Sequence, residues 1–286
     1  MQHVTRGPEP AEQNALPVTD RPWQRLRFAD HLVPRPPVSG INVRCRLEHF
    51  AIVSYAVDPA QLRRLIPPRF MLDTLMIDGR ERGLVSAVPF RNVDFTLAAY
   101  PCPYLRMGQT DYRAYIIDRL TGERAVWFFG TTLDSWALPI PRHVWQQPWH
   151  RGRLRFDCAL DPSASRYEHY RLHTAAPEAS VELSLTQRDV PPPTYPGFPD
   201  EETALVYLTH PLVGFFHRRR DGHLGAYRVW HDQLKVTPGR LLNARFDFFA
   251  RLGLVSLAEQ QHPHSVLMQP INDFTVFLPP TRLEPE

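Results

Sequence analysis

The chain has 286 residues, 43% of them hydrophobic and 22% charged, which suffices for a core and excludes a disordered chain or a disulfide-held miniprotein. The formal net charge of +3 is too small a basic excess to hold nucleic acid. Three widely spaced cysteines, no leader-like apolar segment after Met1 and no run of about 18 apolar residues predict a cytoplasmic protein that does not cross a membrane.

Lysine is nearly absent from the sequence. Lys235 is the single lysine among the 33 basic residues, so the other 32 are arginines. An arginine side chain stays protonated in proteins and cannot act as an amine nucleophile. The composition therefore leaves one lysine for imine chemistry. Its place in the turn-like segment 232–237 predicts an exposed side chain.

Proline marks two irregular segments. Residues 1–40 carry seven of the 30 prolines and little apolar periodicity, which predicts an irregular arm in which Trp23, Leu26 and Phe28 can attach to the body. A second proline-rich stretch at 189–199 predicts a loop. We therefore expect one domain, residues 41–286, preceded by the arm.

Short β-rich runs follow one another along that domain. They cover residues 50–57, 83–90, 112–117, 125–129, 153–160, 167–174, 180–186, 212–218, 224–230 and 265–278. The turn at 120–122 predicts a hairpin, and residues 218–222 are typical of the solvated tip of another. Asp58 followed by Pro59 indicates the start of a short helix, and a second helix is predicted over 243–252.

Many strands and few helices predict a mainly β fold, an antiparallel barrel or sandwich with room for an enclosed cavity. Common motifs for dinucleotides, phosphates, serine nucleophiles and zinc are absent from the sequence. Two close histidine pairs, His169 with His173 and His262 with His264, have no third ligand at a fixed offset. We therefore predict neither a metal ion nor a cofactor.

Residues 109–153 hold the densest mixture of polar and aromatic side chains. On the strand predicted there, Asp111, Arg113 and Tyr115 alternate on one face. An arginine on an apolar strand face is costly unless it is paired or faces a cavity, and its planar fork suits a carboxylate. Two interpretations stay open: Arg113 pairs structurally with Asp111, Asp134 or a glutamate, or it binds an acid ligand.

Several segments, in their order along the chain, resemble the DUF2071 (YqjF-like) family. They are VDPAQLRRLIPPRFMLD at 57–73, LVSAVPFR at 84–91, DYRAYI at 111–116, AVWFF at 125–129, PWHR at 148–151, YRVWH at 227–231 and FLPP at 277–280. Together they cover about 45–280, with the weakest match in the proline-rich loop. The order and number of these segments, more than any single motif, carry the resemblance.

That family is placed in the acetoacetate-decarboxylase-like superfamily, so the resemblance implies an antiparallel barrel-like fold around an internal cavity. The decarboxylase uses a lysine whose pKa is lowered by a cationic neighbour. Here Arg142 and His143 occupy places comparable to the paired lysines of that enzyme. The resemblance therefore argues against an imine-forming decarboxylase. Family members are mostly of unknown activity, so the reaction does not follow from the fold.

We expect an enzyme of lyase, dehydratase, isomerase or cyclase type that acts on a small organic acid or carbonyl compound in the cavity. Arg113 is expected to bind a carboxylate and Tyr115 to donate to an oxyanion. Trp127 and Phe129, on the next strand, are expected to contribute the apolar lining.

Acid–base chemistry is assigned to histidines, because their ordinary pKa lies near neutrality. The candidate catalytic residues are Arg142, His143, His150 and His231, with Asp134 or the substrate-site residue Glu48 orienting a histidine. A non-catalytic small-molecule-binding or sensor barrel is the main alternative, and a partner-binding protein that uses the arm is another. The expected partner is a small molecule, with a carboxylate as one candidate class, and neither nucleic acid nor a membrane is expected. A homo-oligomer is the one protein assembly considered.

Overall fold

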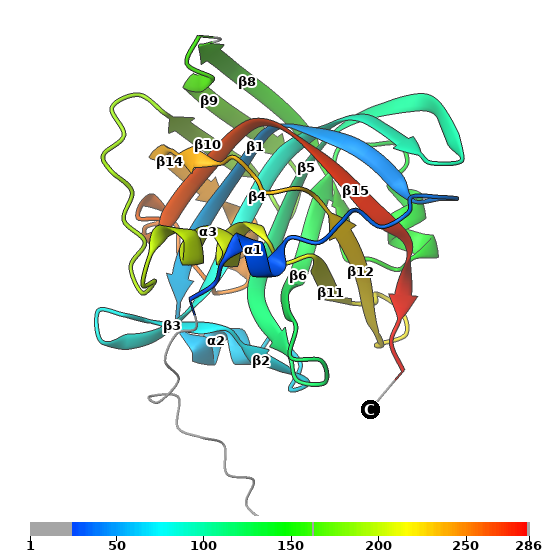
Figure 1. Cartoon of the computed structure of the whole chain (residues 1–286), viewed down its shortest axis with the longest axis horizontal. Helices are drawn as coiled ribbons and strands as arrows, with labels where there is room; N and C mark the ends of the chain where they lie inside the picture. Colours follow the sequence, from blue (N-terminus) through cyan, green and yellow to red (C-terminus); the bar gives the residue numbers. More distant parts are fainter. Residues whose placement is uncertain (1–24, 162, 285–286) are drawn as a thin grey trace, which may run out of the picture.

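A closed ring of seven strands forms the body of the protein. The computed structural model describes residues 25–161 and 163–284. The ring strands are β1 (Val43–Val57), β4 (Arg80–Leu97), β5 (Tyr100–Asp118), β6 (Arg124–Leu133), β11 (Val213–His217), β12 (Leu224–Trp230) and β15 (Ser265–Arg282). They pair in the order β5-β4-β1-β15-β12-β11-β6, and β6 pairs back with β5 (Figure 1). This barrel-like arrangement confirms the predicted mainly β fold.

The ring is mostly antiparallel, as predicted, but two pairings of β6 are parallel. β6 pairs in parallel with β11 and with the short β7 (Trp149–Arg151). Three further short strands, β2 (Phe70–Leu72), β3 (Thr74–Ile77) and β13 (Thr237–Pro238), pair with β5, β4 and β15. The chain reaches β11 only after a second sheet and a helix, so it can arrive in the same direction as β6.

A second sheet packs against the outside of the ring. Its strands are β14 (Arg240–Phe246), β10 (Val181–Thr186), β9 (Arg166–Ala175) and β8 (Arg153–Asp161), in that order. Phe246 of this sheet meets Tyr112 of β5 and Tyr55 of β1 with ring centroids 6.5 and 6.3 Å apart. The ring strands therefore bury both faces, one against the second sheet and one toward the interior of the ring.

The continuous burial of β4 illustrates this two-sided environment. Val85 and Ala87 belong to the core shared with the second sheet, whereas Leu84, Val88 and Phe90 belong to the core inside the ring. Side chains that alternate along a strand point to opposite faces. Both sets must be apolar, which explains the unbroken apolar run that predicted this strand.

Helix α3 (Glu201–Thr209) closes one side of the ring interior, and the sequence analysis missed it. Asp200 caps it by accepting a hydrogen bond from the Thr203 backbone amide, and six of its nine residues are buried. A helix buried on most sides shows little amphipathic pattern. The absence of such a pattern explains the omission.

Residues 26–31 lie against α3. The short helix α1 (Phe28–His31) lies next to it (Figure 1). Phe28 is buried there, and its backbone amide donates to Glu202. The start of the predicted arm is thus packed onto the body, while Trp23 lies outside the described residues. The boundary at residue 40 stays a prediction.

Two predicted helix starts had different outcomes. Helix α2 (Pro59–Arg63) begins after Asp58, whose carboxylate accepts the Ala60 backbone amide, as predicted. The helix predicted over 243–252 was partly wrong, because its first residues belong to β14 and only α4 (Asp247–Arg251) is helical. Pairing with β10 decides the conformation there, since tertiary pairing overrides local propensity.

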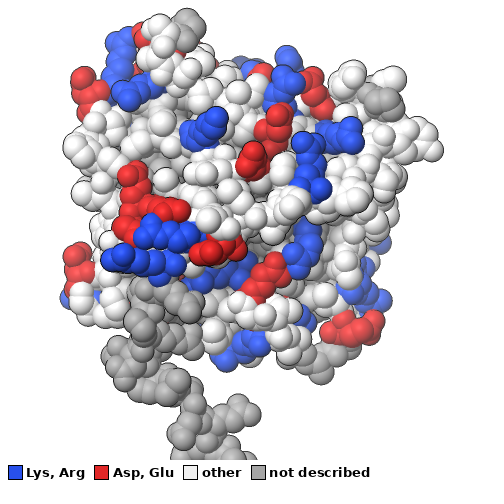
Figure 2. Space-filling view, in the orientation of Figure 1, with Lys and Arg blue, Asp and Glu red and all other residues white. Residues whose placement is uncertain are grey.

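Surface charge is mixed on the face shown in Figure 2, where acidic and basic side chains lie next to one another. Arg27 with Glu202 and Arg46 with Asp94 are examples of such neighbours. Within the described part of the chain, no helix is long and apolar enough to cross a membrane.

Candidate functional site

A cavity of about 560 Å³ lies inside the ring and is lined by residues from all seven ring strands. Most of its lining is aliphatic or aromatic. A few polar side chains converge on it from β5 and β12, among them Asp111, Arg113, Tyr227 and His231. A largely apolar cavity with a few convergent polar groups is typical of small-molecule sites.

Arg113 enters the cavity from β5 and has no carboxylate partner among the described residues. Its Nη2 donates to the backbone carbonyl of Leu208 in α3 at 2.9 Å, and its Nε is buried without a hydrogen bond. The guanidinium lies over the ring of Tyr115, 5.6 Å from the centroid. Of the two interpretations of Arg113, structural pairing with Asp111, Asp134 or a glutamate is not observed. The charge of Arg113 acts on the nearby Asp111 without an ion pair, and it opposes the rise of that carboxyl's pKa.

Asp111 faces the same cavity two residues earlier on β5. Its Oδ1 accepts hydrogen bonds from Gln109 Nε2 at 2.9 Å and from Thr131 Oγ1 at 2.7 Å, so Oδ2 stays open. Asn92 fixes Gln109 by donating to its Oε1 at 3.1 Å. Burial raises the pKa of Asp111, while these two hydrogen bonds and the Arg113 charge act in the opposite direction. Asp111 is thus a carboxyl group whose pKa lies above its ordinary value and whose second oxygen is open to the cavity.

His231 follows β12 and is kept neutral. Its Nδ1 lies 2.8 Å from the backbone carbonyl of Asp232. Because a carbonyl only accepts, the proton sits on Nδ1, and Nε2 carries a lone pair. Burial, with smaller contributions from the charges of His210 and Arg113, lowers the pKa of His231 to about 4. The imidazole is therefore a hydrogen-bond acceptor at neutral pH.

Tyr227 lies on the same face of the chain as His231, four residues earlier. Its ring stacks on Phe128 with centroids 5.5 Å apart and an interplanar angle of 16°. Burial and the nearby Asp111 charge raise the pKa of its phenol well above the ordinary value. The phenol stays protonated and can donate to a ligand oxygen.

Three predicted ligand-binding residues lie outside the cavity. Tyr115 uses its hydroxyl inside the protein, 2.8 Å from Ser86 Oγ and 3.3 Å from the carbonyl of Leu208. Trp127 and Phe129 point to the other face of β6, where Trp127 packs on Phe70. The alternation of β6 brings Val126 and Phe128 to the cavity instead.

Glu48, predicted to be at the substrate site, pairs with Arg91. Arg91 Nη2 lies 2.7 Å from its carboxylate and also contacts His49, at a bulge in β1 away from the cavity lining. The register shift in β1 after Glu48 breaks the simple alternation of that strand. Sequence periodicity alone could not place this side chain.

Arg142, His143 and His150 gather in a separate groove of about 370 Å³. The segment between β6 and β7, with the π-helix at Ile140–Val144, presents residues such as Ile140 and Pro141 to the cavity and these three residues to the groove. Burial, then the positive charge of Arg142, lowers the pKa of His150. The structure thus separates these candidates from Arg113.

Asp134 binds a backbone amide. Its carboxylate accepts a hydrogen bond from the Leu154 amide at 3.1 Å, where β8 begins. Lys235 is exposed and does not line the cavity, in agreement with its predicted exposure. In the described part of the chain, no three His, Cys, Asp or Glu side chains gather into a group that could hold a metal ion.

Two polar residues of the cavity lining, Asp111 and Tyr227, are not among the candidate residues from the sequence. Asp111 was read only as a structural partner of Arg113, although both lie on one face of the predicted strand. Tyr227 shares the spacing of two with Val229 and His231, and this signal was available in the sequence. Period-two alternation from each candidate residue would have found both.

Solved structures with the same fold include enzymes. Acetoacetate decarboxylase from Legionella pneumophila subsp. pneumophila str. Philadelphia 1 is similar over 90% of this chain and 94% of its own, with a TM-score of 0.53 and 13% identity. The enduracididine biosynthesis enzyme MppR is similar over 87% and 89%, with a TM-score of 0.52 and 14% identity. An acetoacetate decarboxylase-like enzyme from Sphingomonas wittichii RW1 is similar over 89% and 98%, with a TM-score of 0.51 and 13% identity. At such low identity the likeness concerns the fold alone.

The family follows from the sequence match. No curated protein matches the chain. The DUF2071 family model, described as an uncharacterized conserved protein, matches residues 44–271, which is well over half of the chain. The matched range contains the cavity-facing polar residues of β5 and β12. The chain is therefore a member of the DUF2071 family with an acetoacetate-decarboxylase-like fold.

Proposed function

We propose that the protein is an enzyme that binds an organic acid or carbonyl compound in the ring cavity and transfers protons without forming an imine. One observation carries the proposal: the Arg113 guanidinium, which has no carboxylate partner, and the neutral His231 line the same cavity. A half-buried cation that lines a largely apolar cavity favours an anionic group there, because a charge left unpaired is costly.

The proposed chemistry begins with charge neutralisation. A carboxylate bound to Arg113 offsets a positive charge that helps to lower the pKa of His231. The bound acid therefore makes the imidazole a stronger base than in the empty site. His231 Nε2 then removes a proton from the carbon next to a carbonyl group, and the Tyr227 hydroxyl donates to the oxygen where negative charge develops.

Asp111 supplies a second proton-transfer group. Its open Oδ2 can return a proton to the ligand or take one from it. Such an acid–base pair serves a dehydration, an isomerisation or a cyclisation, and all three start from the same proton abstraction. An imine route is not proposed, since Lys235 is exposed outside the cavity.

The fold comparison adds support at the level of ligand class. MppR is described in complex with the condensation product of pyruvate and imidazole 4-carboxaldehyde, in a structure with a TM-score of 0.50 and 14% identity to this chain. This ligand belongs to the MppR structure alone. It supports a carbonyl acid as the first class to test here.

A non-catalytic binding or sensor barrel is the second candidate. The low pKa of His231, about 4, favours it, because an imidazole of that pKa is a weak base until a ligand changes its surroundings. This candidate predicts binding of the same acids with no change in the ligand. Turnover therefore separates the two functions.

The binding test uses a panel of 2-oxo and 3-oxo acids and ligand-observed NMR. We expect Arg113→Gln to weaken binding of any acid that binds by about 10- to 100-fold, the loss of a charge-assisted hydrogen bond. Arg228→Gln is the matched control, since Arg228 lies on β12 but is exposed and pairs with Glu123. Equal affinity of the wild type and Arg113→Gln would overturn the proposal.

The turnover test follows each bound acid by NMR over time. We expect His231→Gln to keep the acid bound but to slow its conversion by about 100-fold or more, the usual contribution of a general base. An acid that binds the wild type through Arg113 and stays unchanged would favour the binding barrel.

A further inference from the structure

The cavity is not uniform from one end to the other. At its inner end, Arg113 is anchored to the Leu208 carbonyl of α3 and is followed outward on β5 by Asp111 and Gln109. Asn92 on β4 donates to Gln109 and is the outermost member of this connected polar row. The groups that can hold and change a functional group are therefore concentrated at one end.

Apolar side chains continue the same strands outward. Beyond Gln109, the cavity-facing residues of β5 are Met107 and Leu105, and Leu105 lies opposite Phe95 of β4. Gln109 and Leu105 are four residues apart, or about 13 Å of extended strand. This wall has room for a long apolar group beyond the polar row.

Strands β1 and β15 follow the same pattern. From the inside outward, β1 contributes Leu47, Cys45 and Val43, followed by Ile41 two residues before the strand, and β15 contributes Phe274, Val276 and Leu278. Two polar residues stand in the apolar part of the lining. The Thr96 hydroxyl donates to the backbone carbonyls of Leu97 and Tyr100. Gln147 lies on the segment before β7.

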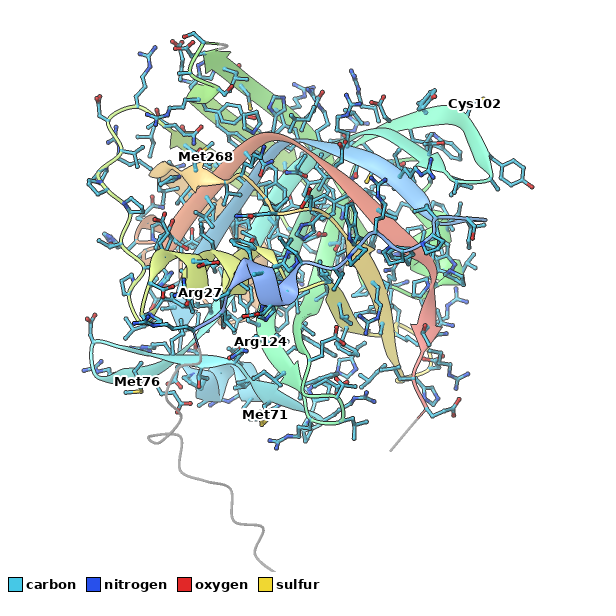
Figure 3. All side chains as sticks on the ribbon, in the orientation of Figure 1. Arg27, Met71, Met76, Cys102, Arg124 and Met268 are labelled. Carbon is cyan, nitrogen blue, oxygen red and sulfur yellow. The ribbon has the colours of Figure 1, made fainter. Side chains whose placement is uncertain are left out.

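Exposed apolar side chains surround the outer end. Among the residues that line the cavity, Trp136 is 73% exposed, Tyr100 67%, Ile140 45% and Ile41 40%. Cys102, also on the lining, lies near the start of β5, in the protruding hairpin of β4 and β5 at the edge of the molecule (Figure 3). Large apolar side chains gathered at one opening mark a binding surface, whereas scattered ones are ordinary.

We infer that the ligand is an acid with an extended apolar body: its carboxylate binds Arg113 and its alkyl or aryl tail fills the outer cavity toward Trp136 and Tyr100. The inference rests on the proposed function for the carboxylate end and goes beyond it for the rest of the molecule. A three-carbon acid would occupy only the end of the polar row at Arg113 and leave the apolar walls in contact with water. A cavity of about 560 Å³ is of the size that holds drug-sized ligands.

The experiment measures dissociation constants for straight-chain carboxylic acids of four to twelve carbons, with primary alcohols of the same lengths as headgroup controls. We expect the affinity of the acids to rise about fourfold per methylene, the value for burying one CH₂ group, and to level off once the tail reaches the opening. Each alcohol should bind at least tenfold more weakly than the acid of its length, because it lacks the charge that pairs with Arg113.

Two variants obstruct the outer cavity and one serves as control. Met107→Trp and Ala137→Trp each place a large ring on the lining and should make the affinity level off at shorter chains. Met76→Trp is the matched control, since Met76 is 47% exposed on β3 and lies at the edge of the molecule (Figure 3). Two positions are used so that a folding defect in one leaves the other informative.

The outcomes separate this inference from the proposed function. Affinity that depends on Arg113 but not on chain length would overturn the extended-ligand inference and leave the proposed function intact. Affinity that rises equally for acids and alcohols, and is unchanged in Arg113→Gln, would uphold the apolar body and overturn the carboxylate role. Chain-length dependence that is identical in the wild type, Met107→Trp and Ala137→Trp would overturn the placement of the tail.

Discussion

The neutral state of His231 links the site to the stability of the protein. The ordinary pKa of histidine is 6.5, and in the folded chain burial and neighbouring positive groups lower it to about 4. Between these values the unfolded chain binds the proton and the folded chain does not. The free energy of unfolding is therefore fully retained above pH 6.5 and falls as the pH decreases toward 4.

We expect the His231→Gln variant to lose less stability on acidification than the wild type. The difference should grow between pH 6.5 and pH 4 and reach at most about 3 kcal/mol, because each pKa unit corresponds to about 1.4 kcal/mol. Urea unfolding at several pH values measures it. The measurement compares how the free energy of unfolding changes with pH in the two proteins, so any pH-independent effect of the substitution cancels. Parallel slopes for the two proteins would contradict the buried neutral imidazole.

At the scale of elements, β11 and β6 approach each other closely enough to fix a cavity wall. Gly214 of β11 lines the cavity next to Phe128 of β6, and a Cβ at position 214 would lie 2.2 Å from a carbon of the Phe128 ring. Phe128 also stacks on Tyr227, the proposed hydroxyl donor. The glycine thus allows the parallel pairing of two strands and the placement of a site residue at once.

The Gly214→Ala variant should be less stable than the wild type by about 1–3 kcal/mol, the usual cost of overpacking a rigid core. It should also weaken acid binding, since a displaced Phe128 moves Tyr227. The double variant Gly214→Ala/Phe128→Leu removes the clashing ring carbon and should recover part of the stability. Thermal unfolding measures both. If the double variant is no more stable than the single one, the contact is not the cause.

At the scale of the whole molecule, the second sheet is held to the ring by buried aromatic side chains. Tyr170 of β9 is fully buried, donates its hydroxyl to the His49 carbonyl of β1 at 2.9 Å, and meets Tyr167 edge-on at 5.5 Å. The cavity lies on the other side of the ring strands. Packing of the second sheet therefore supports the cavity wall from outside.

We expect Tyr170→Ala to lower the free energy of unfolding by about 3–5 kcal/mol, the range for removing a large buried aromatic ring. Tyr104→Ala is the control, because Tyr104 is 64% exposed, and it should change stability by less than about 0.5 kcal/mol. Chemical denaturation followed by fluorescence and circular dichroism measures both variants. Similar losses in the two variants would show that the sheets do not depend on this contact.

The local pattern of the sequence determined most of the strands and the face that Arg113 shares with Asp111. Alternation placed Asp111 and Arg113 on one face, and the ordered segments resembling DUF2071 implied the fold and the internal cavity. These features depend on near neighbours along the chain, because side chains two residues apart in a strand share a face whatever lies beyond. Helix α3 was not predicted because a helix buried on most sides lacks the polar face that makes a helical repeat visible in the sequence.

Tertiary structure decided which of the candidates meet. Arg113 and His231 lie 118 positions apart in the sequence and face one cavity because the strands close into a ring. Trp127 and Phe129 point away from the cavity because the pairing of β6 with its neighbours decides which of its side chains face inward. His143 and His150 lie in a separate groove because the segment between β6 and β7 separates that groove from the cavity. The sequence by itself determined the fold class and the chemistry available, whereas ring closure and strand register, which depend on pairing over long distances in the chain, determined the site.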